Sequence, residues 1–241
     1  AYLQLADKNN ARMAFEQAAA SNANSQVKEQ AAYNYALCIH ETSFSAFGES
    51  VTVFERFLND YPNSSYAERV SSYLVELYMN TRSYDAALAS IERIGNPSAQ
   101  ILEAKQKILF QLGTQAFTNT AFDEAISYLT RSLDLGSYNK QTKANSFYWR
   151  GEAKYRLNAK DGAKSDFLSY LQSTLDNQSD MYALAHYNLG YISFEKKAYS
   201  EAREWFSKFT RLYRGSDKMA LADAYNRIGD TYLRVRNFND A

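Results

Sequence analysis

The sequence contains few of the residues that break helices, form disulfides or bind metals. Its 241 residues include two prolines, nine glycines, one cysteine and two histidines. So few helix breakers favour helices over a turn-rich β fold. The single cysteine, Cys38, excludes an internal disulfide. We interpret His40 and His186 as packed side chains, because a zinc site needs three or four clustered ligands, and we expect no cofactor.

Charge of one sign and long apolar runs are also missing. The 27 basic and 27 acidic residues cancel, so the basic surplus that strong nucleic-acid binding requires is absent. No stretch approaches the roughly 18–20 apolar residues of a membrane-spanning helix. Glycine-rich phosphate loops and the HExxH and GxSxG motifs are absent as well. These absences argue against nucleic-acid partners, a membrane span and the common hydrolase sites.

The sequence does contain a repeat with a period of 37–39 residues. One column of mostly small residues recurs at that interval and comprises Cys38, Val75, Gly113, Gly151, Gly190 and Gly229. A second column runs in phase with it and comprises Ala11, Ser50, Ala87, Ala125, Ala163, Ala202 and Ala241. A fixed period of this length is typical of repeat proteins, which form long continuous surfaces and not one central cleft.

Within one period, residues 181–209 show apolar side chains at three- and four-residue spacing in two blocks. Each block predicts an amphipathic helix of about four turns, and residues 195–198 between them predict a tight reversal. Glycine inside a helix costs about 1 kcal/mol relative to alanine. The glycine column therefore indicates close helix contact, against the large residues that follow the second column by four positions: Phe15, Phe54, Ile91, Leu129, Phe167 and Phe206.

Two segments identify a family resemblance. Asn188-Leu189-Gly190 with Ala202 and Phe206 resembles the tetratricopeptide repeat, W-x2-L-G-x2-Y followed by A-x3-F. The segment Ile228-Gly229-x-x-Tyr232, with the turn aromatic Phe238 and with Ala241, resembles the same motif. Aromatic residues also stand at the equivalent turn positions Phe47, Tyr84, Phe122 and Tyr199.

The resemblance implies an all-α, right-handed α-α superhelix of about 13 helices in one array. Whole units are expected at 31–64, 68–101, 106–139, 144–177 and 183–216, with partial units at 1–25 and 222–241. In the third unit, Gly95-Asn96-Pro97 predicts an early end of the second helix, with Gly95 as its C-cap. Ser98 is expected to cap a long helix that runs to about Thr118.

The segment from Phe54 to Ala67 resembles F-x-x-F-L-x-x-Y-P-x-S-x-Y-A of bacterial envelope tetratricopeptide proteins, such as outer-membrane assembly lipoproteins and the Tol–Pal coordinator. This resemblance implies a periplasmic or outer-membrane-associated location in a Gram-negative bacterium; the alternative is the cytoplasm. Both ends of the chain lie within the repeat pattern. We therefore expect a fragment of a longer array whose ends can associate end to end.

In this family the first helix of each unit lines the concave groove, so the resemblance implies a scaffold that binds a protein or peptide there. Interface hot spots favour Tyr, Trp and Arg. The predicted groove residues are Phe110, Phe117, Tyr148, Glu152, Tyr155, Tyr187, Tyr191 and Phe194. Glu152 is included because it follows Gly151 and faces the same groove.

Two other functions are open at this point. Exposed tyrosines could stack on sugars, which would make the chain a non-catalytic binder of peptidoglycan or another polysaccharide. An α/α carbohydrate-active enzyme is also built from helix hairpins, but it needs paired acids about 5–9.5 Å apart. Glu76 and Glu152 are two repeats apart, which is too far, so we expect that the protein is not an enzyme.

Overall fold

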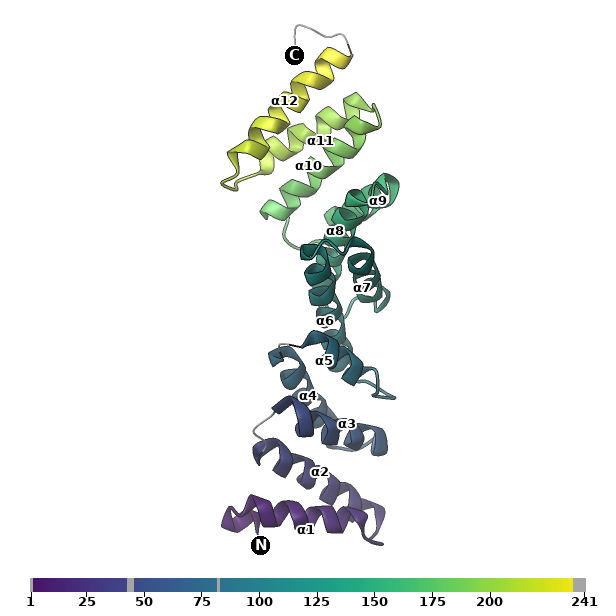
Figure 1. Ribbon diagram of the computed structural model, residues 1–241, viewed down its shortest axis with the longest axis vertical. Helices are drawn as coiled ribbons and strands as arrows, with labels where there is room; N and C mark the ends of the chain where they lie inside the picture. The colour runs from purple at the N-terminus through teal and green to yellow at the C-terminus, as the bar shows by residue number, and fades with distance from the viewer. Residues whose placement is uncertain (1, 43–45, 82, 236–241) are drawn as a thin grey trace. The chain divides into compact units, whose positions relative to one another are not determined.

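The computed structural model describes residues 2–42, 46–81 and 83–235. In these ranges the chain forms twelve α-helices and two short helical turns, and no strand (Figure 1). The predicted all-α fold is confirmed. The thirteenth helix, expected around Phe238 and Ala241, lies outside the described residues, as do the side chain of Phe47 and the residues from 236 onward. The chain divides into two compact units, which meet in sequence between Leu109 and Phe110.

Unit 1 begins with a helical hairpin, in which α1 and α2 pack side by side (Figure 1). The side chain of Asp7 caps α1 by accepting a hydrogen bond from the Asn10 amide at 3.2 Å. The elements of this unit are η1 (Leu3–Leu5), α1 (Lys8–Ala20), α2 (Ser25–Thr42), η2 (Ala46–Ser50), α3 (Val51–Asp60), α4 (Ala67–Asn80), α5 (Tyr84–Ile91) and the first half of α6 (Ala99–Thr118).

The interruption predicted in the third unit exists, but its details differ. Helix α5 ends at Ile91, so the proposed C-cap Gly95 lies beyond the helix and does not cap it. Gly95 instead donates its amide to the side chain of Asn59 at 2.9 Å, which in turn donates to the carbonyl of Arg93 at 3.1 Å. The side chain of Ser98 accepts from the Ile101 amide at 3.4 Å, and α6 extends to Thr118 as predicted.

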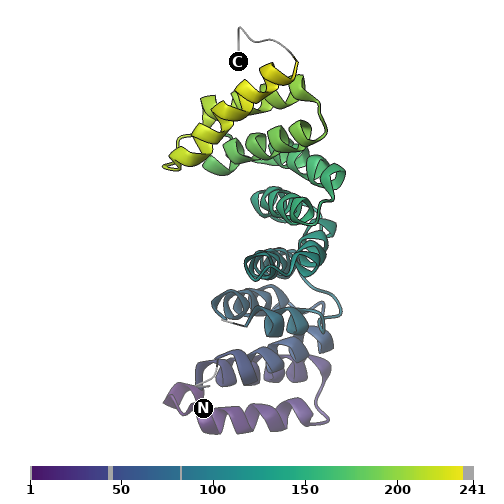
Figure 2. The ribbon, with the colours of Figure 1, turned by 45° about the horizontal axis from the view of Figure 1, so that its top comes forward.

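Unit 2 contains the end of α6 followed by regular helix pairs. In Figure 2, α10, α11 and α12 lie side by side, and these neighbours pack in sequence order. Side chains of Asn139, Ser179 and Asp217 cap the helices that follow them. The remaining helices are α7 (Phe122–Asp134), α8 (Lys140–Arg156), α9 (Lys160–Ser173), α10 (Asp180–Glu195), α11 (Tyr199–Leu212) and α12 (Lys218–Arg234).

The three hairpin turns of unit 2 share one geometry. Thr120, Asn158 and Lys197 adopt left-handed backbone angles, with φ of 61°, 61° and 62°. The next residue in each turn donates its amide to the carbonyl five positions back, at 2.9 Å in all three cases. This Schellman arrangement satisfies carbonyls at the helix end and reverses the chain. The tight reversal predicted at residues 195–198 is therefore confirmed.

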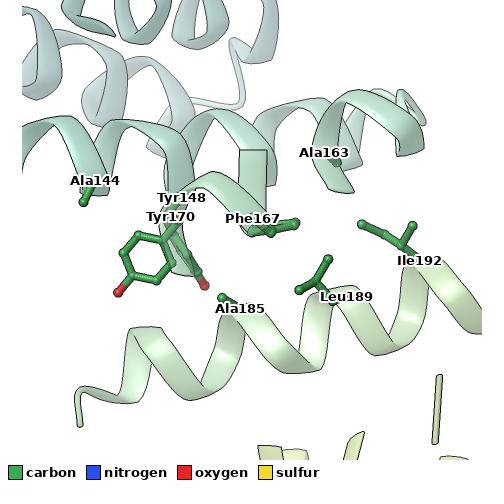
Figure 3. Packing of buried hydrophobic residues seen from close by; sticks show 8 residues of the cluster. All are labelled: Ala144, Tyr148, Ala163, Phe167, Tyr170, Ala185, Leu189 and Ile192. Atoms are coloured by element: carbon green, nitrogen blue, oxygen red, sulfur yellow. The ribbon is translucent and has the colours of Figure 1, made fainter. Parts of the chain in front are cut away.

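The glycine column lets neighbouring helices approach closely. A Cβ atom on Gly113 would lie 2.6 Å from Leu129, and one on Gly190 would lie 2.7 Å from Phe206. Gly151 is slightly less crowded, with a Cβ position 3.1 Å from the ring of Phe167. These large partners are the residues predicted to face the column. Figure 3 shows Phe167 of α9 in the core cluster, on the side that faces Ala185 and Leu189 of α10.

Candidate functional site

Tyr148, predicted to contact a partner, is a core residue. Its side chain is only 5% exposed, and its ring packs edge-on against Phe167 and Tyr170, at centroid distances of 5.6 and 5.3 Å (Figure 3). The prediction that its ring lines an open surface is therefore wrong. Its hydroxyl donates to Glu152 at 3.1 Å, so Tyr148 instead positions a neighbouring side chain.

Phe110 and Phe117 are half-buried and pack on the cluster formed by Ala116, Ala125, Leu129 and Ala153. The Phe117 ring lies edge-on to Phe122 and to Trp149, with centroids 5.4 and 5.0 Å apart. The two predicted residues at the start of unit 2 thus pack against the hairpin core and are only partly exposed.

Tyr187 and Tyr191 on α10 are joined to α12 through one carboxylate. The Tyr187 hydroxyl donates to Asp223 at 2.8 Å, and Tyr191 donates to the same oxygen. Both rings lie edge-on against Phe206. Burial, followed by the hydrogen bonds to Asp223, raises the pKa of both tyrosines. Burial alone would raise the pKa of Asp223, but the two hydroxyl donors and the charge of Arg227 lower it overall.

Arg227 on α12 extends this contact. Its Nε donates to the Tyr191 hydroxyl at 3.3 Å, and its terminal nitrogen pairs with Asp230 at 2.7 Å. The guanidinium group lies 5.7 Å from the ring centroid of Phe194, which is within cation–π range. Phe194 itself is half-buried against Tyr199.

A similar contact joins α8 to α10. The Tyr155 hydroxyl donates to Glu195 at 3.0 Å, and Lys160 pairs with the same carboxylate at 3.0 Å. Glu152 is half-buried and accepts hydrogen bonds from Tyr148 and Asn188. Burial raises the pKa of Glu152, although both hydrogen bonds oppose that change.

These contacts form three hydrogen-bonded groups that join three successive first helices, and together we call them the α8–α10–α12 ladder. It consists of Glu152, Tyr155, Tyr187, Asn188, Tyr191, Glu195, Asp223 and Arg227. Sequence analysis identified four of these residues and missed Asn188, Glu195, Asp223 and Arg227. The repeat period could have located the missed residues, because three of the hydrogen bonds join residues 36 positions apart, about one repeat.

Two other residues considered for chemistry, His186 and Cys38, are buried. His186 is 5% exposed, its Nδ1 lies 2.9 Å from the carbonyl of Tyr182, and burial lowers its pKa. Cys38 is 2% exposed, and burial raises the pKa of its thiol, which keeps it protonated and unreactive at neutral pH. In the part of the chain that the structure describes, no three His, Cys, Asp or Glu side chains gather in a metal-binding arrangement. No helix there has both the length and the hydropathy to cross a bilayer.

The fold and the ladder define the class of protein, a repeat of antiparallel helix pairs with side-chain contacts between successive units. Within that class, residues 183–215 match the tetratricopeptide repeat family. These residues cover most of α10 and all of α11.

Solved structures that are similar to this chain include BtubC, MamA and YrrB. BtubC from P. vanneervenii aligns over 97% of this chain and 86% of its own, with 15% identity and a TM-score of 0.54. MamA aligns over 73% and 86%, with 18% identity and a TM-score of 0.48. YrrB, described as a TPR protein with an unusual peptide-binding site, aligns over 88% and 98%, with 19% identity and a TM-score of 0.44. No curated protein sequence matches this chain.

Proposed function

We propose that this chain is a tetratricopeptide scaffold that binds a protein or peptide along the α8–α10–α12 ladder. The observation that carries the proposal is that half-buried Tyr, Asn and Arg side chains hydrogen-bond from each of three first helices to the next. Such side chains are already ordered before a partner arrives, which reduces the entropy that binding costs. Tyr and Arg are also the residues that contribute most at protein interfaces. The proposal contains no catalytic step and no cofactor.

The chemistry of the ladder favours a partner segment with basic or amide groups. Its ionisable side chains include the carboxylates of Glu152, Glu195 and Asp223, against the single guanidinium of Arg227. Each carboxylate can accept more hydrogen bonds than it receives from its neighbours. Stacking on peptidoglycan sugars would instead require open ring faces. The Arg227 guanidinium lies over the Tyr191 ring, 5.9 Å from its centroid, and the Tyr187 ring packs on Phe209, which supports the peptide proposal over that alternative.

The test removes hydroxyl groups and keeps the rings. Partners are captured with the wild-type chain, identified by mass spectrometry and titrated by calorimetry against Tyr187→Phe/Tyr191→Phe. We expect affinity to fall about tenfold, because Asp223 loses the donors that hold it in place. Tyr138→Phe is the matched control, since Tyr138 is 41% exposed and lies before α8, outside the ladder. Equal affinity of the double variant and the control would reject this surface.

We also propose that the protein acts in the cell envelope of a Gram-negative bacterium, and this rests on the segment from Phe54 to Ala67. In the structure, Phe54, Phe57 and Leu58 of this segment are core residues of unit 1, with 0%, 2% and 6% exposure. Fractionation of the producing cells tests the location, using an antibody against the chain. Recovery with the cytosol would reject the envelope location and leave the scaffold proposal intact.

A further inference from the structure

Unit 1 contains an open groove between α1 and α3, with α2 as its floor. A cavity of about 340 Å³ lies between the C-terminal halves of α1 and α3, and one of about 390 Å³ lies beside their earlier turns. The two cavities share Tyr35 and Val53, so they are parts of one depression, which we call the α1–α3 groove. Its walls include Glu16 and Ala20 on α1 and Arg56 and Phe57 on α3.

Small side chains at the end of α1, Ala19 and Ala20, line the groove. Ala19, which lines it, stands eight residues after the column residue Ala11. The same offset in α3, α7 and α9 gives Leu58, Leu133 and Leu171. Three other second helices thus carry leucine where α1 carries alanine. The missing side-chain volume leaves apolar surface of Tyr35, Val53 and Phe57 as the lining.

The rim of the groove carries charges without ion-pair partners. Arg56 and Asp60 on α3 are exposed, and neither forms a hydrogen bond or ion pair through its side chain with any residue that the structure describes. On the facing helix, Glu16 receives only a long hydrogen bond from Tyr35, at 3.4 Å. Comparable charges in unit 2 are paired between repeats, as Lys164 is with Glu201 at 2.7 Å. The groove therefore combines an apolar floor with available charges of both signs.

We propose that the α1–α3 groove binds an amphipathic helix of a partner protein. Arg12 and Glu16 border the two successive cavities, and their four-residue separation corresponds to about 6 Å along α1. Apolar residues at positions i and i+4 of a bound helix have the same spacing, so one enters each cavity. The rim selects a helix with an acidic residue beside Arg56 and basic residues beside Glu16 and Asp60. This site is separate from the ladder and does not depend on it.

The first experiment uses a fluorescent synthetic helical peptide with leucines at i, i+4 and i+8, one acidic edge and one basic edge. Anisotropy with the full chain should show saturable binding at about micromolar concentration. Ala20→Trp places a large ring in the groove from an exposed position and should weaken binding about tenfold or more. Ala14→Trp is the matched control, because Ala14 is also exposed on α1 but lines neither cavity. Circular dichroism confirms that both variants remain helical.

The second experiment tests the charges. A peptide with its acidic and basic residues exchanged should bind the wild type about threefold more weakly, and the double variant Arg56→Glu/Asp60→Lys should reverse that preference. Both effects should shrink as salt is added. The proposal is overturned if neither peptide binds or if Ala20→Trp binds as well as Ala14→Trp. It is also overturned if light scattering shows a dimer that Ala20→Trp dissociates, because the occupant is then a second copy of this chain.

Discussion

The two units use the same repeat position in opposite ways. Tyr35 in unit 1 and Tyr187 in unit 2 each stand three residues before the small column. Tyr187 hydrogen-bonds to Asp223, one repeat further on, and its ring packs on Phe209 with centroids 4.9 Å apart. Tyr35 forms the floor of an open groove. The difference shows that a shared motif determines the helix hairpin, while the side chains around it determine whether a surface is filled or open.

The largest effect should come from the close helix contacts of unit 2. Gly190→Ala adds a Cβ 2.7 Å from the fully buried ring of Phe206, whereas Gly95→Ala in unit 1 meets nothing closer than 3.7 Å. Overpacking of about 3 kcal/mol should exceed the gain of about 1 kcal/mol in helix propensity, because two atoms of the Phe206 ring would lie within 2.8 Å of the added atom. Urea unfolding followed by circular dichroism should show a lower midpoint for Gly190→Ala. A midpoint above that of the wild type would show that Phe206 can shift, because only the gain in helix propensity would then remain.

The next effect concerns the carboxylate that joins α10 to α12. Asp223→Asn should cost about 1 kcal/mol at neutral pH, because the acceptor of two tyrosine hydroxyls loses its charge. The pKa of Asp223 is lowered in the folded state, so its contribution is present above about pH 4 and is lost as the pH falls further. Urea unfolding between pH 3 and 7 should therefore show that the unfolding free energy of the variant falls less than that of the wild type as the pH approaches 3. If the unfolding free energies of the wild type and the variant differ by the same amount at every pH, the charge of Asp223 does not cause the pH dependence.

In unit 1 we expect a substitution to increase the stability of the fold. Ala19→Leu introduces the residue that α3, α7 and α9 carry at the same position and fills part of the α1–α3 groove. Burying most of the added methyl and methylene groups should stabilise the unit by about 1 kcal/mol. The control is Ala14→Leu on the exposed side of α1. If both variants gain equally, burial in the groove does not explain the change, because leucine has no helix propensity advantage over alanine.

Regular hairpins could be predicted because the period, the small residues and their large partners are all local in the sequence. The pairing of Gly190 with Phe206 is an example, since both residues belong to one hairpin. The exposure of individual side chains was harder to predict, because it depends on contacts with neighbouring repeats and with second helices. Tyr148 is buried by Phe167 and Tyr170 of α9, and Asn188 of the next repeat binds Glu152.

The α1–α3 groove could not be predicted from the motif, because it results from a missing side chain. Ala19 is an ordinary helix residue, and only its comparison with Leu58, Leu133 and Leu171 shows that volume is absent. Likewise, the early end of α5 followed from Pro97, but the bridge from Asn59 to Gly95 did not. The Gly95 amide can donate to many polar side chains, so the sequence alone does not identify Asn59 as its acceptor.

The smallest effect should be a pH dependence carried by His186. Burial beside Trp205 lowers its pKa, so the unfolded chain binds a proton below about pH 6.5 that the folded chain does not bind until lower pH. Stability should decrease as the pH falls from 7 through this window and level off below the folded pKa. His186→Phe keeps an aromatic ring on Trp205 and should remove the slope, which thermal unfolding between pH 5 and 7.5 would measure. His40→Phe, with its ring near Phe54 and Tyr73, is the control and should retain the slope. A slope that survives in His186→Phe would assign the titration to another group.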